Sequence, residues 1–311
     1  MTSIRSIVAA TDFSAHARHA AERAARLARS ADASLTLVHA LSGSAMDELY
    51  RWFGIQGEVP RALVDAAQTK LHALATDLAE RHHGRVDERL RVGSTVEEIV
   101  RVAEAADADV VVTGTRGSGF VRSHVIGSTA QRIVKRSGRP VLMVRQMPYE
   151  PYRRVLVPVD FSEWSLPAVE TARCIAPDAL FVLMHAVLVP FEGHLRYAGV
   201  EDKVIASYRT RALDAARDEL AKLAAAAGLS SRQWIALTPH AADPWMQIVE
   251  QEQEYDCDLV VVGKHGRNAL AELILGSTTQ MVLAECAGDV LVSTARTATS
   301  AEEAASQATK R

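Results

Sequence analysis

Short, uninterrupted apolar runs alternate with longer amphipathic stretches through most of the chain. Such runs are typical of strands buried on both faces of a parallel sheet, and the stretches between them have the spacing of helices. The runs lie at residues 6–11, 34–40, 87–92, 109–113 and 140–144 in the first half, and at 154–159, 180–186, 231–237, 258–263 and 289–293 in the second. Each half is therefore predicted to contain five strands separated by four helices, in the order β-α-β-α-β-α-β-α-β.

The helix expected at residues 15–30 indicates how the predicted layers would pack. Its apolar stripe is almost entirely alanine, and its charged side chains fall largely outside that stripe. The whole chain is 48% hydrophobic but only 5% aromatic, so Val, Ile, Leu and Ala must fill the core. Small side chains let helices approach β-branched strands closely, which favours an α/β fold over an all-β fold.

The same sequence landmarks occur twice, in the same order and at a nearly constant distance. Asp12-Phe13-Ser14 returns as Asp160-Phe161-Ser162, Leu37-Val38-His39-Ala40 as Leu183-Met184-His185-Ala186, and Gly127-Ser128-Thr129 as Gly276-Ser277-Thr278. These offsets of 148, 146 and 149 residues are far longer than a solenoid repeat and indicate a duplicated domain. We expect domain 1 at residues 1–147, domain 2 at residues 153–294, and a disordered tail at residues 295–311.

Length and composition exclude several classes of protein. A chain of 311 residues allows about two domains, and its formal net charge of -3 provides no general basic field for nucleic acid. The three cysteines, Cys174, Cys257 and Cys286, have no CxxC or metal-ligand spacing, which favours buried thiols, a reducing compartment and no metal site. The amino terminus lacks the apolar core of a signal peptide, and the longest apolar stretch, residues 180–191, is too short to span a membrane. We therefore expect a soluble, cytoplasmic protein with no membrane partner.

A glycine pattern follows the fourth predicted strand of each half. Gly114 and Gly117 precede Gly127-Ser128 at the same spacing at which Gly263 and Gly266 precede Gly276-Ser277. Glycine allows a ligand to approach the backbone at the carboxyl edge of a parallel sheet, and a helix start offers N–H groups to phosphate. Ser128 with Gln131, and Ser277 with Gln280, have the spacing of capping boxes. The pattern indicates a phosphate cradle in each half. The alternative is that the glycines only end a strand and the serines only cap a helix.

Three motifs together resemble the universal stress protein family in its tandem, two-domain form. They are Asp-Phe-Ser after the first strand, Val-His-Ala or Met-His-Ala at the end of the second, and G-2x-G-9x-G-[ST] after the fourth. The resemblance covers residues 4–144 and 154–293. It implies two tandem Rossmann-like domains, each an open five-stranded parallel sheet flanked by helices, with ATP as the ligand, alone or with Mg²⁺. It also implies pairing of the domains through their fifth strands, residues 141–144 and 290–292, with a homodimer as the alternative partner arrangement.

The same resemblance implies roles for individual residues. Asp12 and Asp160 would line the adenosine side of each pocket, with a helix N-terminal acid as the alternative role, and Ala40 and Ala186 would border the adenine. The phosphate cradle would comprise Gly114, Gly117, Gly127, Ser128 and Thr129 in domain 1, and Gly263, Gly266, Gly276, Ser277 and Thr278 in domain 2. Phosphate charge would be neutralised by Arg116, Arg122, His124, Lys264, His265 and Arg267, whose alternative is a solvated loop face. His39 and His185 are expected to be core histidines with satisfied hydrogen bonds, and no catalytic residue is assigned.

The two halves differ at positions that bear on binding. Gly93 aligns with Ala242, and Pro140 aligns with Asp289 at the start of the last strand. Residues 1–150 carry 20 Lys or Arg and 17 Asp or Glu, whereas the remainder of the chain carries 15 and 21. A polyanionic ligand should therefore prefer domain 1.

Three functions are compatible with the sequence. The leading one is an ATP-binding, stress-responsive regulatory protein. The second is an enzyme, either a slow ATPase or an adenylating enzyme of a related fold, although the chain has no Walker A motif, SGGxDS loop or GxSxG elbow. The third is a scaffold that has lost nucleotide binding in domain 2.

Overall fold

The computed structural model describes residues 3–54, 57–116, 126–188, 192–240, 243–266 and 275–294. Domain 1 comprises β1 (Ser6–Ala10), α1 (Ala15–Ala31), β2 (Ser34–Ser42), α2 (Gly43–Phe53), α3 (Glu58–His82), β3 (Val86–Gly93), α4 (Thr95–Ala105), β4 (Val110–Gly114), α5 (Ser128–Arg136) and β5 (Val141–Val144). Domain 2 comprises β6 (Arg154–Pro158), α6 (Ser165–Ile175), β7 (Leu180–Met184), α7 (Glu192–Tyr197), α8 (Asp202–Ala226), β8 (Trp234–Leu237), α9 (Pro244–Glu254), β9 (Leu259–Gly263), α10 (Ser277–Glu285) and β10 (Asp289–Ser293). The predicted tail and Ala242 lie outside the described residues.

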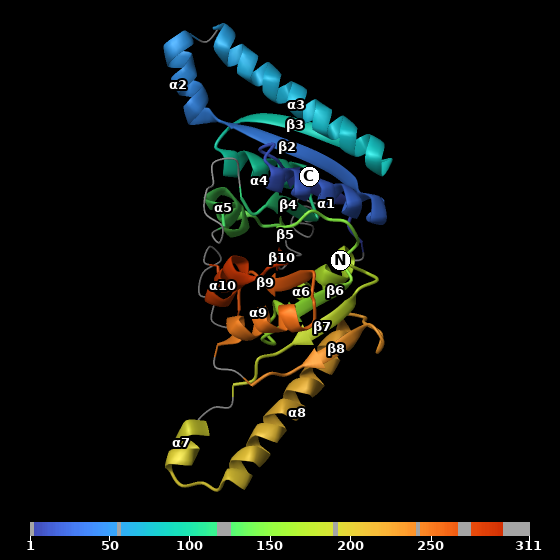
Figure 1. Ribbon diagram of the computed structural model, residues 1–311, viewed down its shortest axis with the longest axis vertical. Helices are drawn as coiled ribbons and strands as arrows, with labels where there is room; N and C mark the ends of the chain where they lie inside the picture. Colours follow the sequence, from blue (N-terminus) through green and yellow to red (C-terminus); the bar gives the residue numbers. More distant parts are fainter. Residues whose placement is uncertain are drawn as a thin grey trace, which may run out of the picture.

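The strands form one sheet in the order β3-β2-β1-β4-β5-β10-β9-β6-β7-β8. Strands within each half pair in parallel, and the two halves meet where β5 and β10 pair antiparallel, with Leu142 opposite Leu291. Figure 1 shows the resulting elongated molecule, with the long helices α3 and α8 near its opposite ends. The predicted fold class of two tandem parallel α/β sheets is confirmed.

Each crossover between the second and third strands of a half contains two helices, whereas the sequence pattern predicted one. In domain 1 these helices are α2 and α3, and in domain 2 they are α7 and α8. Gly54 follows α2 and Gly199 lies after α7, and both have a φ of +76°, a left-handed conformation that ends a helix. The prediction of four helices per half is therefore wrong, because these glycines divide one long amphipathic stretch.

Two apolar clusters pack on the opposite faces of the sheet. One includes alanines of α1 and residues of α3, α6 and α8, and the other includes residues of α4, α5, α9 and α10. Ala20, Ala21 and Ala24 of α1 are fully buried, which brings this helix close to β1 and β4. None of the described helices is long and apolar enough to cross a membrane.

A buried polar network joins the two halves beside β5 and β10. Asp289, at the start of β10, accepts hydrogen bonds from the Arg145 backbone N–H at 2.8 Å and the Tyr152 hydroxyl at 2.6 Å. Its carboxylate also lies 3.4 Å from Nε of Arg23, whose guanidinium stacks 3.9 Å from the Tyr152 ring centroid. Burial raises the pKa of Tyr152, so this hydroxyl stays protonated and donates to Asp289.

Candidate functional site

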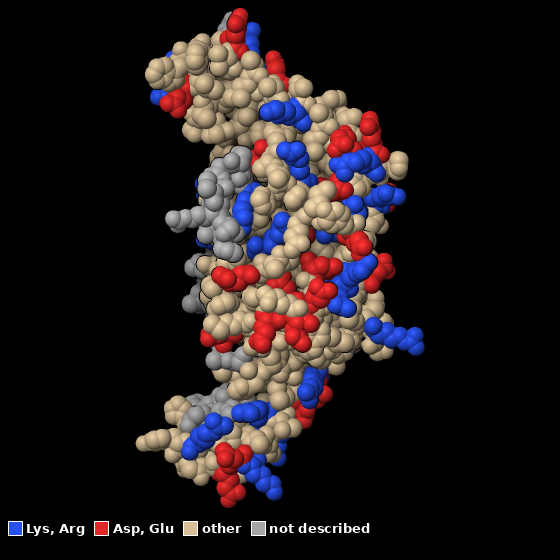
Figure 2. Space-filling model, in the orientation of Figure 1, with Lys and Arg blue, Asp and Glu red and all other residues tan. Residues whose placement is uncertain are grey.

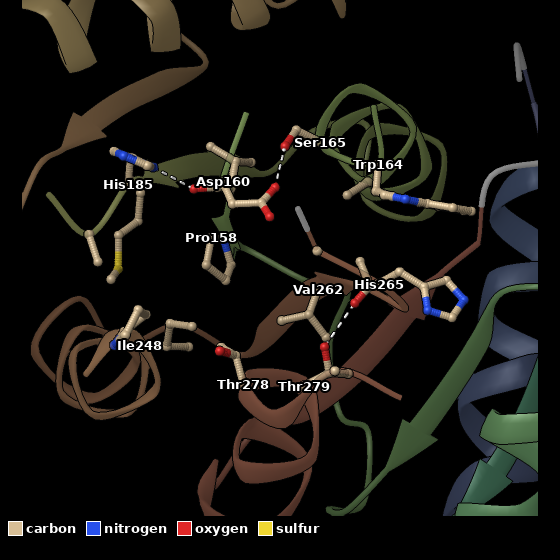
Figure 3. Close-up of a pocket in the computed structure, with 18 of the residues that line it drawn as sticks. Pro158, Asp160, Trp164, Ser165, His185, Ile248, Val262, His265, Thr278 and Thr279 are labelled. Carbon is tan, nitrogen blue, oxygen red and sulfur yellow. Dashed lines mark hydrogen bonds between the residues drawn. The ribbon is translucent and has the colours of Figure 1, made fainter. Parts of the chain in front are cut away.

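A cavity lies at the carboxyl edge of the parallel strands in each half. The domain 1 cavity has a volume of 370 Å³ and is bordered by β1, β2 and β4 and by the start of α5. The domain 2 cavity has a volume of 770 Å³ and occupies the equivalent position (Figure 3). Open parallel sheets bind their ligands at this edge. Both cavities are therefore candidate binding sites.

The residues predicted for each cradle lie around these two cavities. The domain 1 cavity is lined by Asp12, Ala40, Gly114, Gly127, Ser128 and Thr129. The domain 2 cavity is lined by Asp160, Ala186, Gly263, Gly266, Gly276, Ser277 and Thr278. Gly117 lies outside the described residues. The structure thus brings together every predicted cradle residue that it describes.

The turn from the first strand into the first helix fixes the acidic residue of each cavity. In domain 1, Asp12 Oδ1 accepts the Ser14 N–H at 3.0 Å, and Ser14 caps α1 through the Ala17 N–H. Phe13 adopts a left-handed φ of +63°, which is strained for a side chain of this size. Phe161, its counterpart in domain 2, has a φ of +57°. The same strained corner thus occurs at both cavities.

A histidine near the end of the second strand of each half packs against this corner, and it lies within β2 in domain 1 and directly after β7 in domain 2. His39 Nδ1 donates to the Thr11 carbonyl at 2.7 Å, and its ring packs 4.4 Å from the ring of Phe13. His185 donates to the Val159 carbonyl at 2.8 Å and packs 4.3 Å from Phe161. Both histidines line their cavities and are only partly buried. They differ from the expected core histidines in bordering the cavities, although their Nδ1 hydrogen bonds are satisfied.

The helix that starts beside each cavity, α5 or α10, begins one residue earlier than the capping boxes implied. Gly127 and Gly276 are the N-cap residues, so Ser128 and Ser277 are the first helical residues and make no side-chain cap hydrogen bond. The capping-box prediction is wrong because the glycine backbone, through its extended conformation, already supplies the cap position. The first-turn N–H groups and the Ser hydroxyl consequently border the cavity.

Close backbone packing holds the other side of the domain 1 cradle. A Cβ atom at Gly114 would lie 2.8 Å from the carbonyl group of His16 on α1, so only glycine allows β4 and α1 to approach this closely. The Gly127 N–H donates to the Thr115 carbonyl at 2.8 Å, which joins the end of β4 to the start of α5. Burial, together with the charges of Arg116 and His19, lowers the pKa of His16 despite the opposing effect of Asp12.

Two of the six candidate phosphate-neutralising residues line the cavities. Arg116 lines the domain 1 cavity and His265 lines the domain 2 cavity, whereas Arg122, His124 and Arg267 lie outside the described residues. Lys264 differs from both sequence expectations, since it is 7% exposed and its Nζ donates to the Ser137 carbonyl of domain 1 at 2.9 Å. That carbonyl follows α5 of the other domain, a contact that no local sequence pattern encodes.

Several residues that border the cavities were not singled out from the sequence. They are Thr11, Thr95 and Thr113 in domain 1, and Val159, Pro244, Val262, Trp164 and Met184 in domain 2. The first three domain 2 residues occupy the repeat positions of the three threonines, at offsets of 148 or 149 residues. Aligning the two halves position by position would have singled out these residues, because each threonine of domain 1 aligns with an apolar residue of domain 2.

Comparison with known proteins agrees with this architecture. The model of the universal stress protein family matches residues 3–145 and again residues 151–294. A universal stress protein of Thermus aquaticus is 35% identical over 141 residues, which are 45% of this chain and 98% of that protein. Universal stress protein G of Shigella flexneri is 31% identical over 114 residues, covering 37% of this chain and 79% of that protein.

Solved structures support the fold over the full tandem arrangement. A universal stress protein from Archaeoglobus fulgidus has a TM-score of 0.66 at 16% sequence identity, covering 93% of this chain and 98% of that chain. The family model matches both halves of the chain, and the predicted resemblance is confirmed. The chain therefore belongs to the universal stress protein family, as a tandem of two family domains.

Proposed function

We propose that the protein is a regulator that binds an adenine nucleotide in domain 1, with ATP, alone or with Mg²⁺, as the ligand. The observation that carries the proposal is the start of α5, whose uncapped first turn and Ser128 hydroxyl border the same cavity as Asp12 and Arg116. A helix N-terminus and a guanidinium favour phosphate, and a carboxylate at the opposite side favours the hydroxyl donors of a ribose.

The charge on α5 adds to this preference for a polyanion. Its nine residues include Arg132, Lys135 and Arg136 and no acid, so the helix carries three formal positive charges. Arg136 forms an ion pair with Glu97 of α4 at 2.8 Å, and Arg132 remains on the exposed face. Lys135 and Arg136 lie in the last turn, at the end of α5 away from the cradle, so their charges would attract ATP phosphates from a distance and not by contact.

Binding rather than rapid turnover is the proposed activity. The titratable residues among the described lining of the domain 1 cavity are Asp12, His39 and Arg116. Asp12 Oδ1 is held by the Ser14 N–H, and His39 Nδ1 donates to a backbone carbonyl, so both side chains are committed to the strained corner. Nucleotide occupancy would then act by changing what the protein binds. Cys174, Cys257 and Cys286 form no disulfide in the described part of the chain, which fits a reducing compartment, and we place the protein in the cytoplasm on that ground.

Replacing Ser128 by aspartate tests the proposal. Ser128 is exposed at the first position of α5, where a carboxylate favours the helix but repels the phosphates of a ligand. In S128D we expect the Kd for ATP, measured by calorimetry with Mg²⁺ present, to rise at least about tenfold. Ser207→Asp, the same change on the exposed surface of α8, should leave the Kd unchanged.

Two results would contradict nucleotide binding in domain 1. One is the absence of ATP binding by the unmodified protein at millimolar ATP. The other is an equal Kd for the unmodified protein and S128D. Rapid ATP hydrolysis that is lost in Asp12→Asn would instead favour the enzyme reading, since that residue would then act on the reacting atoms.

A further inference from the structure

We propose that the domain 2 cavity binds an uncharged ligand of the nucleoside class and discriminates against nucleoside polyphosphates. The inference rests on the proposed function in that it takes the nucleoside side of the two cavities to be shared. Asp160, His185 and Ala186 keep the positions of Asp12, His39 and Ala40 in the repeat. What differs between the cavities is polarity, charge and volume.

Loss of hydroxyl groups is the first difference. Thr11, Thr95 and Thr113 line the domain 1 cavity, and their repeat counterparts in domain 2 are Val159, Pro244 and Val262. Three hydroxyls are thus replaced by apolar groups. The Thr113 hydroxyl donates to the Gly114 carbonyl at 3.2 Å and the Thr11 hydroxyl accepts the Phe13 N–H at 3.1 Å, so Thr11 and Thr95 are the two that keep a proton for a phosphate oxygen or its bound water.

Two other lining positions change the opposite way, from Ala17 to Ser165 and from Ala130 to Thr279. The Ser165 hydroxyl, however, donates to Asp160 at 3.3 Å, and the Thr279 hydroxyl donates to the Gly263 carbonyl at 2.9 Å. A charged group in the domain 2 cavity would lose water without gaining these partners.

Loss of positive charge is the second difference. His265 replaces Arg116, and an imidazole does not carry the obligatory charge of a guanidinium at neutral pH. Lys264, the described cation nearest the domain 2 cradle in sequence, directs its ammonium to the Ser137 carbonyl. Within the described lining of this cavity, the remaining positive feature is the start of α10, and this helix carries one acid and no Lys or Arg.

The surface around the domain 2 cavity is also acidic. Figure 2 shows Asp and Glu side chains gathered over the part of domain 2 formed by α9 and α10. Glu250 and Glu254 of α9 and Glu285 of α10 are exposed. A polyphosphate would approach domain 2 against this charge, whereas an uncharged ligand would not be affected.

Aromatic and apolar side chains line the larger cavity of domain 2. Trp164 and Met184 line the cavity, and the Trp164 ring meets the His265 ring edge-on at 5.1 Å (Figure 3). His265 is 7% exposed, and its Nδ1 has no hydrogen-bond partner among the residues that the structure describes. A buried polar atom at a cavity wall without a partner is typical of a position that a ligand or an ordered water satisfies. These groups fit a flat aromatic ring with hydrogen-bonding edges.

The carboxylate of Asp160, which also lines the cavity, is fixed by hydrogen bonds. Its Oδ1 accepts the Ser162 N–H at 3.0 Å and the hydroxyls of Ser162 and Ser165 at 2.6 and 3.3 Å. The carboxylate so held accepts further hydrogen bonds from hydroxyl or amino groups of a ligand. The cavity therefore pairs an aromatic wall with an acceptor for a polyol, as an uncharged nucleoside requires.

The test uses full-length S128D, in which we expect ATP binding by domain 1 to be weakened, with adenosine and ATP as the probes in calorimetry. We expect S128D to bind adenosine at least about tenfold more tightly than ATP. Adding Trp164→Ala should weaken adenosine binding about tenfold by removing a stacking surface, and Trp164→Phe should retain most of the affinity. Trp52→Ala is the matched control, because Trp52 is 77% exposed on α2 of domain 1.

A reciprocal variant tests whether the replaced lining residues are the reason that domain 2 discriminates against ATP. Val262→Thr combined with His265→Arg restores the domain 1 residues, and we expect this pair to raise the ATP affinity of S128D about tenfold. The inference is overturned if S128D binds ATP as tightly as adenosine, if it binds no adenosine at millimolar concentration, or if W164A and W164F leave adenosine binding unchanged. If the unmodified protein binds no ATP while W164A still weakens adenosine binding, the proposed function fails and this inference stands.

Discussion

Lys264 illustrates how one side chain can leave the cavity to which its backbone belongs. Its carbonyl accepts the Gly276 N–H at 3.3 Å, which closes the domain 2 cradle, while its Nζ donates to the Ser137 carbonyl at 2.9 Å. Ser137 is the C-cap of α5, where carbonyl groups lack helical partners and the helix dipole is negative. A buried ammonium at this point satisfies one of those carbonyls.

Replacing Lys264 by methionine separates this structural role from a role in phosphate binding. K264M keeps the apolar stem but leaves a buried carbonyl unpaired, so we expect the free energy of unfolding to fall by about 1.5 kcal/mol in urea denaturation. The ATP affinity should be unchanged. Lys203→Met on the exposed surface of α8 should alter neither quantity. A tenfold loss of ATP affinity in K264M would show that the ammonium reaches the nucleotide.

Residues of the cradles could be predicted from the sequence because each lies within a local motif. Gly127 and Ser128 stand at a fixed spacing from the end of β4, and the structure places them at the cavity. The direction of the Lys264 side chain could not be predicted, since its partner is 127 residues away in the other domain. The replacement of Thr113 by Val262 is visible in the sequence, but only the cavity gives it meaning.

At the scale of elements, a buried carboxylate fastens the long helix α3 to α1. Glu22 of α1 is 3% exposed, and its Oε1 lies 2.9 Å from Nε2 of His82 and 3.2 Å from Nε of Arg26. Its Oε2 accepts a hydrogen bond from Arg81, the penultimate residue of α3. Burial alone would raise the pKa of Glu22, but the hydrogen bond from Arg81 and the charges of His82 and Arg81 lower it overall.

The lowered pKa of Glu22 sets the direction of a pH effect. A carboxyl with a pKa lower in the folded state stabilises the fold above its ordinary value of 4.5 and loses that contribution as the pH falls through the folded value. We expect Glu22→Gln to reduce the free energy of unfolding by about 2 kcal/mol at pH 7, and the deficit to shrink below pH 4.5.

Chemical denaturation of E22Q and the unmodified protein at neutral and acidic pH measures this difference. Glu80→Gln, on the exposed face of α3 next to Arg81, should be neutral at both pH values. A deficit that stays constant on acidification would mean that shape rather than charge accounts for the contribution of Glu22.

Element types were more predictable than element ends. The last strand was predicted at its observed bounds, Asp289–Ser293, because a continuous apolar run defines it. The division of the second crossover into α2 and α3 was missed, since amphipathic spacing continues past Gly54 and only its left-handed conformation reveals the break. The strand β8 begins three residues later than predicted, at Trp234, because Gln233 Oε1 accepts the N–H and hydroxyl of Ser230 in a turn.

At the scale of the whole molecule, the tandem arrangement followed from the repeat, but the chemistry of the junction did not. Asp289 aligns with Pro140, and the sequence gives no indication that this carboxylate is buried at 3% exposure. Its partners come from three separate segments: Arg23 on α1, Arg145 after β5 and Tyr152 before β6. The junction is therefore asymmetric, since no acid can occupy the equivalent place at Pro140.

We propose that this junction couples the two domains in solution, and Asp289→Ala tests it. The substitution leaves the Tyr152 hydroxyl, the Arg145 N–H and the Arg23 guanidinium without their buried acceptor. We expect a loss of about 3 kcal/mol in the free energy of unfolding at pH 7, whereas Asp218→Ala on the exposed face of α8 should change it by less than about 0.5 kcal/mol.

A double-mutant cycle with Arg23→Met measures whether Asp289 of domain 2 is energetically coupled to Arg23 of domain 1. Arg23 belongs to domain 1 and Asp289 to domain 2, and Nε of Arg23 lies 3.4 Å from the Asp289 carboxylate. Without Asp289, Arg23 keeps its hydrogen bond to the Glu150 carbonyl and its contact with the Tyr152 ring but has lost its ion pair. Its removal should then cost less than in the unmodified protein, so the double variant should be more stable than the sum of the single losses implies, by about 1 kcal/mol or more. Additive losses, or a single loss in D289A no larger than in D218A, would mean that β5 and β10 pair without energetic coupling through this network.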